Sequence, residues 1–161
     1  MRPGEIGELI ARGAIFVVNH SGGKDSQAML LFLKTFVPHE QLLVVHAVLP
    51  EVEWDGVQEH ISATVDGVHI IKCQARRTLL QMIEERGMFP SPSQRQCTSD
   101  LKRGPIEKAI RNTGHKLIVS CMGMRAEESS SRSKLTTFKR SDRNSKAGRE
   151  WYEWLPIHGM K

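Results

Sequence analysis

The sequence predicts an α/β fold in three layers, with a mostly parallel, twisted sheet and helices on both faces. Short apolar, β-branched runs typical of buried parallel strands occupy residues 14–20, 42–49, 68–73 and 116–123. Stretches with helical spacing of apolar residues lie at residues 25–36, 54–65, 75–86 and 99–112. The 161 residues suit a single domain with one hydrophobic core. Because the two kinds of segment alternate, each connection places its helix over a parallel sheet.

The order of the elements also predicts where a ligand binds. Strand 14–20 is the first predicted element, and helix 25–36 follows it. Strand 42–49 comes next, and helix 54–65 connects it to strand 68–73. Two helical stretches then precede strand 116–123. In such sheets ligands collect at the carboxyl ends of the strands. The segments that follow the strands are therefore the first places to search for functional residues.

The composition indicates a globular cytoplasmic protein. Hydrophobic residues make up 39% of the chain and charged residues 25%, which is typical of a folded soluble domain. No apolar run is long enough to span a membrane, and the first residues lack the basic start of a secretory signal. The three cysteines are unevenly spaced, with no CxxC pair, so neither a disulfide framework nor an iron–sulfur cluster is expected. We infer a reducing compartment and no membrane partner.

The net charge of +5 indicates an anionic partner, and part of that charge is concentrated late in the chain. Residues 130–148 are poor in apolar side chains and rich in Lys and Arg. We expect this segment to be an exposed, mobile basic loop. It would either contact a nucleic acid or simply be solvated.

The hexapeptide SGGKDS lies where strand 14–20 is expected to give way to a helix. Glycines permit close approach to a ligand, and the N–H groups that open a helix attract anions. The serine hydroxyls add hydrogen-bond donors, the lysine adds a full positive charge, and Asp25 in the first turn could orient a magnesium ion. The lysine follows the glycine directly and precedes an aspartate, so this is no Walker A loop. The expected phosphate-binding residues are Ser21, Gly22, Gly23, Lys24, Asp25 and Ser26.

SGGxDS after a buried strand resembles the signature of the PP-loop superfamily, the ATP pyrophosphatases and their relatives. A second segment, GMRAEESSSR, resembles the G-x-R-x-x-x-S-x-x-R element of the phosphoadenosine phosphosulfate (PAPS) reductases. Arginine binds phosphate or sulfate oxygens in a bidentate manner that lysine cannot copy. The matching positions are Gly123, Arg125, Ser129 and Arg132.

A third segment, residues 97–111, resembles the part of that family in which a cysteine precedes a lysine and a proline. The resemblance makes Lys102 a candidate phosphate contact and Cys97 a candidate catalytic residue. It covers residues 1–161 as a single PAPS reductase-like nucleotide-binding domain and implies an adenine nucleotide alpha-hydrolase-like fold. Thr98 and Ser99 are also ordinary helix-capping residues.

The chain departs from the family in two places. The family carries an Asp-Thr-Gly type turn after its second strand, where this chain has Leu49-Pro50-Glu51-Val52-Glu53-Trp54, and we expect Trp54 to pack rather than to stack on a base. The family's redox thiol lies in a C-terminal Cys-Gly-Leu-His type motif, and no cysteine follows Cys121 here. We therefore expect a missing C-terminal tail. His20 and His46 are expected to be satisfied residues at the edge of the core.

Three functions remain open at this stage. The first is a sulfonucleotide reductase-like oxidoreductase that acts on PAPS or adenylyl sulfate, with a thioredoxin-like reductant. The second is an ATP-dependent enzyme that adenylylates a substrate and releases pyrophosphate, with magnesium. The third is a non-catalytic module that binds a nucleotide or a nucleic acid. The resemblance of residues 123–132 to the reductase branch favours the first.

Overall fold

The computed structural model describes residues 3–20, 23–48, 56–64, 67–74, 104–123, 134 and 136–159. Its helices are α1 (Pro3–Ala11), α2 (Lys24–Lys34), the short 3-10 helix η1 (His39–Gln41), α3 (Val57–Thr64) and α5 (Gly104–Asn112). Its strands are β1 (Ile15–Asn19), β2 (Leu42–Ala47), β3 (His69–Cys73), β4 (Leu117–Cys121), β5 (Phe138–Arg140) and β6 (Glu150–Trp154).

The strands form one six-stranded sheet in the order β3-β2-β1-β4-β6-β5. All neighbouring pairs are parallel except β5 with β6, which is antiparallel. The prediction of a mostly parallel α/β sheet is therefore confirmed, and each of the four predicted strands is present. The predicted helix 75–86 lies outside the described residues, as does the start of the predicted helix 99–112.

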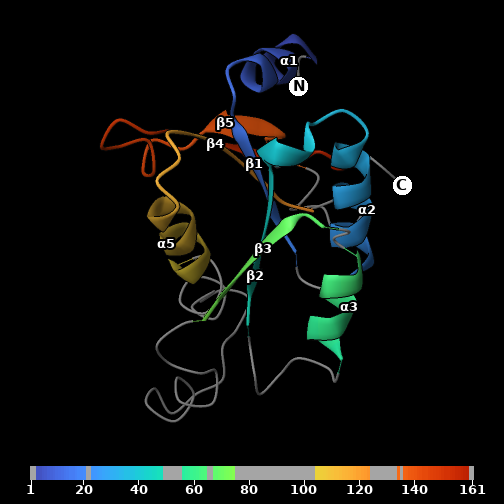
Figure 1. Ribbon diagram of the computed structural model, residues 1–161. Coiled ribbons are helices and arrows are strands. Elements are labelled where there is room, and N and C mark those ends of the chain that lie inside the picture. The colour runs from blue at the N-terminus through green and yellow to red at the C-terminus, as the bar shows by residue number, and fades with distance from the viewer. Residues whose placement is uncertain are drawn as a thin grey trace.

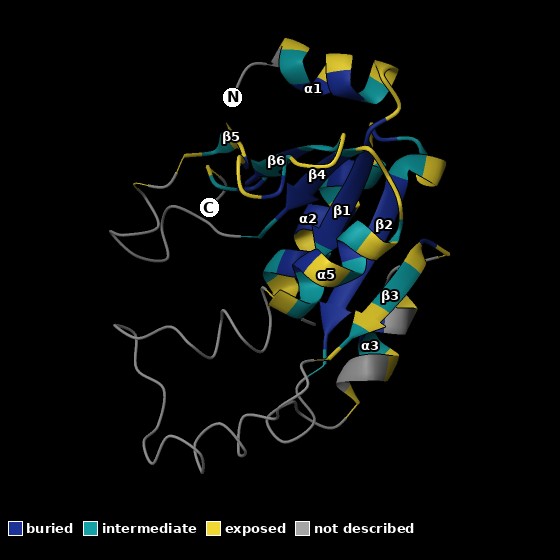
Figure 2. Ribbon diagram, turned by 90° about the vertical axis from the view of Figure 1, so that its left-hand side faces the viewer, coloured by how far each residue is buried: buried dark blue, intermediate teal, exposed yellow. Residues whose placement is uncertain are grey.

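Helices cover both faces of the sheet, and the two faces have separate cores. Alternate residues of a strand point to opposite faces. Phe16 and Val18 of β1 therefore pack with residues of α1, α2 and α3, whereas Ile15 and Val17 pack with Ile110 of α5. Figure 1 shows α2 and α3 on one side of the sheet and α5 on the other. Figure 2 shows β1 buried along its length in the middle of these layers.

The structure contains an N-terminal helix that the sequence analysis did not predict. Pro3 opens α1 in the position where proline suits a helix, and Ile6, Leu9 and Ile10 are spaced to form one apolar face. The helix ends before Gly13, whose φ of +83° permits the turn into β1. Because Ile6 and Leu9 are buried in the core, α1 closes one end of the sheet.

The expected basic loop at residues 130–148 is not entirely a loop. It contains β5, and Ser141 and Asn144 within it are buried. The chain then turns through Ala147 and Gly148, both with positive φ, into β6. Trp151 and Trp154 of β6 enter the cores on opposite faces of the sheet. The stretch is therefore joined to the sheet through the pairing of β5 with β6, which two buried tryptophans anchor. Among the described residues, no helix is long and apolar enough to cross a membrane.

Candidate nucleotide-binding site

β1 and β4 are the neighbouring strands at which the strand order of the sheet reverses. From β1 the chain crosses through α2 to β2 on one side, whereas from β4 it continues to β6 on the other. Two neighbouring parallel strands whose connections run to opposite sides leave a crevice between them, and this crevice is where α/β sheets bind ligands. Both motif segments predicted from the sequence begin here, one after β1 and one after β4.

The described residues of the expected phosphate-binding segment, Gly23 to Ser26, form the start of α2. Gly23 is the N-cap residue, in extended conformation, and it contributes no side-chain hydrogen bond to the first turn. The helix begins at Lys24, and Gln27 N donates to the carbonyl oxygen of Gly23 at 3.2 Å. The first turn of a helix carries partial positive charge from its N–H groups. The start of α2 thus has the orientation that an anion in the crevice requires.

Lys24 and Asp25 differ in their exposure. The Lys24 side chain is 82% exposed, and its Nζ lies 3.4 Å from Asp25 Oδ1. Asp25 is 28% exposed, and Ser26 is buried. Because an ion pair of this length at the surface contributes little to stability, the lysine can exchange its carboxylate for a phosphate at low cost.

Gly123 brings the second motif segment against the first. A Cβ atom added to Gly123 would lie 3.5 Å from the backbone C and O of Asp25 and 3.6 Å from the backbone N of Ser26. The backbone that leaves β4 therefore passes close to the first turn of α2, with room for no more than a Cβ atom between them. The structure thus brings Gly123 near Asp25 and Ser26.

The other predicted site residues lie outside the described residues. These are Ser21 and Gly22 of the first segment, Arg125, Ser129 and Arg132 of the second, and Cys97 and Lys102 of the third. Trp54 also lies outside. Only Gly23 to Ser26 of the first segment and Gly123 of the second can therefore be compared in position.

Asn19 is a residue of this site that the sequence analysis missed. It is the last residue of β1, and its Nδ2 donates to the Cys121 carbonyl oxygen at 2.8 Å and to Ser120 Oγ at 3.0 Å. Its side chain thus joins the ends of the two strands that border the crevice. An asparagine at a strand end is a common residue in that place, so the sequence carried no signal for this contact.

His20 and His46 lie next to each other, at the carboxyl ends of β1 and β2. Both are buried, and His46 Nδ1 donates to the His20 carbonyl oxygen at 2.7 Å. The pKa of His20 is lowered to about 4, mainly by burial and to a smaller extent by the nearby His46 and His60. His20 is therefore neutral at pH 7. The structure places both histidines at the edge of the core, as the sequence analysis expected.

The two described cysteines are poor nucleophiles. Burial raises the pKa of Cys73 to about 11 and raises that of the fully buried Cys121 still more. A thiol attacks only as its thiolate, so neither residue supplies one at neutral pH. Among the described residues no group of three or more His, Cys, Asp or Glu is arranged to hold a metal ion.

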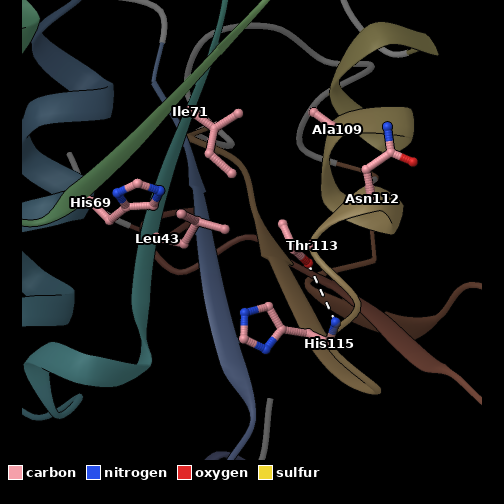
Figure 3. A pocket seen from close by; sticks show the side chains of 7 residues that line it. All are labelled: Leu43, His69, Ile71, Ala109, Asn112, Thr113 and His115. Carbon is pink, nitrogen blue, oxygen red and sulfur yellow. Dashed lines mark hydrogen bonds between the residues drawn. The ribbon is translucent and has the colours of Figure 1, made fainter.

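A cavity of about 520 Å³ lies on the α5 face, toward the amino ends of β2 and β3. Figure 3 shows His69 and His115 with the apolar side chains of Leu43 and Ile71 near them. The backbone N–H of His115 donates to Thr113 Oγ1 at 3.4 Å. The lining of the cavity contains Leu43, His69, Ile71, Ala109, Asn112, Thr113 and His115. None of these carries the fixed positive charge that a polyphosphate needs, and none was predicted as a site residue. The lining of this cavity therefore does not suit a polyphosphate.

Comparison with known proteins identifies the fold and the family of this chain. The solved structure of phosphoadenylyl-sulfate (PAPS) reductase from Candida auris, a phosphate complex, superposes with a TM-score of 0.50 at 10% sequence identity. The match covers 100% of this chain and 82% of the other, and at this identity it shows a common fold. A comparison with curated proteins finds no match. The family model of the phosphoadenosine phosphosulfate reductase domain matches residues 15–161, and the chain therefore belongs to this family of the PP-loop superfamily.

Proposed function

We propose that this chain binds a (phospho)adenylyl sulfate in the crevice between β1 and β4 and that the sulfur of this nucleotide is transferred or reduced there. The observation that supports the proposal most is the short distance between Gly123 and the first turn of α2, where only the space of one Cβ atom separates them. The described ends of the two motif segments, Asp25 and Ser26 in one and Gly123 in the other, therefore lie close together. Two segments suited to anions that meet at a ligand-binding edge fit a ligand with more than one anionic group.

The residues divide into two groups in this proposal. Residues 21–26 hold the phosphate next to the adenosine, through backbone N–H groups, the serine hydroxyls and Lys24. By resemblance to the family, Arg125, Ser129 and Arg132, with Lys102, hold the sulfate or the second phosphate. Lys24 supports this division because its side chain is 82% exposed at the start of α2. His20 beside the loop is neutral at pH 7 and adds no charge.

The reduction needs two thiols. The first attacks the sulfur, breaks its bond to the phosphate oxygen and releases the adenosine phosphate, which leaves an S-sulfonate on the thiol. The second attacks that thiol's sulfur, forms a disulfide and releases sulfite. Cys73 and Cys121 do not fit the first role because burial raises their pKa values. The proposal therefore assigns the attacking thiol to Cys97 or to a cysteine outside these 161 residues, and the second to a thioredoxin-like reductant.

The ATP-dependent alternative rests on Asp25. Its carboxylate lies in the first turn of α2 and is partly exposed, where it can reach a magnesium ion held mainly by phosphates and water. In that case the enzyme would form an adenylylated intermediate and release pyrophosphate.

The nucleic-acid alternative rests on the basic stretch that contains β5. Several of its cations already lie beside carboxylates: Lys139 beside Glu153, Arg140 beside Asp142, and Arg143 beside Glu107. Cations that neutralise the protein's own acids release fewer counterions from a phosphate backbone. This arrangement favours a nucleotide ligand.

Isothermal titration tests the binding step. PAPS, adenylyl sulfate, ATP with magnesium, and a DNA or RNA oligomer are titrated into the wild type and into Lys24→Ala and Arg125→Ala. We expect a sulfated nucleotide to bind most tightly and both variants to bind it more weakly. Tight, salt-sensitive oligomer binding without nucleotide affinity would contradict both enzymatic functions.

A reaction assay separates the two enzymatic functions. Sulfite release from PAPS with thioredoxin supports sulfur reduction. Pyrophosphate release from ATP, without sulfite from PAPS, would instead support the adenylylating enzyme.

A further inference from the structure

Asn19 continues the connection between β1 and β4 beyond the point where their backbones stop pairing. The last paired residues in the register are Val18 and Cys121. Asn19 follows Val18, and its side chain donates to the Cys121 carbonyl oxygen at 2.8 Å and to Ser120 Oγ at 3.0 Å. A carbonyl oxygen only accepts, so the amide nitrogen must face β4. Both N–H bonds of the amide are therefore committed to the neighbouring strand.

The consequence concerns the two segments that leave these strands. One residue after Asn19 the chain reaches His20 and then the phosphate-binding loop. Two residues after Cys121 it reaches Gly123, where an added Cβ atom would touch the backbone of Asp25 and Ser26 at the start of α2. The strand ends, the start of α2 and Gly123 therefore lie close together, and the Asn19 side chain links the two strand ends.

We propose that Asn19 is a positioning residue that sets the distance between the two anion-binding segments, so that one nucleotide contacts both at once. This inference rests on the proposed function. A ligand held by two segments binds tightly when their spacing matches it, and loses affinity when the spacing must be restored on binding. In the part of the chain that the structure describes, the Asn19 side chain donates to uncharged groups, so its effect on binding passes through the spacing.

Gln41 provides a matched control within the same sheet. Its Nε2 donates to the carbonyl oxygens of Ile10 at 3.1 Å and Ala14 at 2.8 Å, near the amino end of β1. Like Asn19, it is a part-buried primary amide that donates two hydrogen bonds within the fold. It differs in its location, at the edge of the sheet away from the crevice. Removing it costs comparable hydrogen bonds without moving the two segments.

The affinity test compares Asn19→Ala with Gln41→Ala. We expect Asn19→Ala to bind the sulfated nucleotide about ten-fold more weakly, as for the loss of one or two net hydrogen bonds in binding. Gln41→Ala should bind within about two-fold of the wild type. In the Arg125→Ala background one of the two segments no longer holds the nucleotide. Adding Asn19→Ala should therefore weaken nucleotide binding by less than about two-fold. Equal losses in both backgrounds, or no loss in either, would overturn the proposal.

A second measurement needs no ligand. Hydrogen exchange of the free protein should rise in Asn19→Ala over residues 20–27 and 122–125 together, and should not rise there in Gln41→Ala. If the wild type binds none of the nucleotides, the proposed function fails, and exchange alone decides whether Asn19 couples the two segments. If Asn19→Ala does not fold, Ser120→Ala removes one of its two acceptors and should raise exchange at the same segments by less. Unchanged exchange there would refute the coupling.

Discussion

The Lys24 side chain offers a test of the proposed phosphate-binding segment, residues 21–26. It is 82% exposed and paired only loosely with Asp25, so Lys24→Ala should leave the unfolding midpoint unchanged. Nucleotide affinity should fall about ten-fold or more, because a charge-assisted hydrogen bond to phosphate is lost.

Lys146→Ala is the control for this substitution in calorimetry. Lys146 is equally a surface lysine, but it precedes β6 and so lies toward the amino ends of the strands. Equal losses in the two variants would show that net charge, rather than the loop, attracts the nucleotide.

The cysteines give a prediction about reactivity. Cys73 and Cys121 have raised pKa values, so at pH 7.5 neither should react quickly with iodoacetamide or a disulfide reagent. Any fast-reacting thiol should therefore be Cys97, identified by peptide mass spectrometry after a short labelling pulse. Labelling of Cys73 or Cys121 at the rate of a free thiol would contradict their burial.

The contact between α5 and the β5–β6 connection gives a prediction about stability. Glu107 is nearly buried on α5, with Arg143 at 2.5 Å and Arg111 at 4.0 Å. Arg111 also reaches Asn144 Oδ1 at 3.4 Å, so one helix holds the connection at two points. Glu107→Ala should lower the free energy of unfolding in urea by about 1–3 kcal/mol, since it leaves Arg143 and Arg111 without their carboxylate.

The control for Glu107 is an ion pair in solvent. Asp142 is 98% exposed beside Arg140, and Asp142→Ala should leave the urea midpoint unchanged. If the two substitutions have the same effect, burial does not decide the strength of these pairs.

Gly123 tests how closely the second segment approaches α2. The added Cβ of Gly123→Ala would stand at 3.5 Å from Asp25, an ordinary contact, so this variant should keep both its stability and its nucleotide affinity. Gly123→Val adds two methyl groups in the same space and should separate the segment from α2, with weaker nucleotide binding in titration. Equal affinity in the two variants would mean that this contact does not shape the site.

The elements differ in how far they could be predicted. The strands that carry long apolar runs, such as β1 and β2, were predicted almost to the residue, because burial on both faces requires such runs. The hairpin of β5 and β6 was missed because β5 has one aromatic residue, Phe138, beside a lysine and an arginine, and because glutamates interrupt the aromatic residues of β6. The Phe138 and Tyr152 rings stack with their centroids 5.3 Å apart, and the Trp154 and Phe16 rings pack edge to face with centroids 6.1 Å apart. These contacts exist only after folding.

The whole protein should lose stability in mild acid, and His20 is one cause. Burial holds the pKa of His20 at about 4 in the folded protein, below its usual value of 6.5. The unfolded chain therefore takes up the proton first, so this contribution is complete above pH 6.5 and is lost as the pH falls toward 4. The loss amounts to at most about 3 kcal/mol.

Urea unfolding between pH 7 and pH 4 measures this effect. His20→Gln removes the titrating group and should flatten the profile between pH 6.5 and 4 relative to the wild type. Parallel profiles for the two proteins would assign the acid sensitivity to other groups.

The sequence alone determined the α/β class and the positions of the buried strands, and it predicts that SGGKDS binds phosphate. It could do so because hydrophobic period, glycine placement and charge are local properties that a short window of residues carries. Tertiary structure alone decided that β1 and β4 are neighbours, that Gly123 lies close to the first turn of α2, and that Asn19 joins the two strand ends. These contacts link residues about a hundred positions apart, and only the packing of the sheet brings them together.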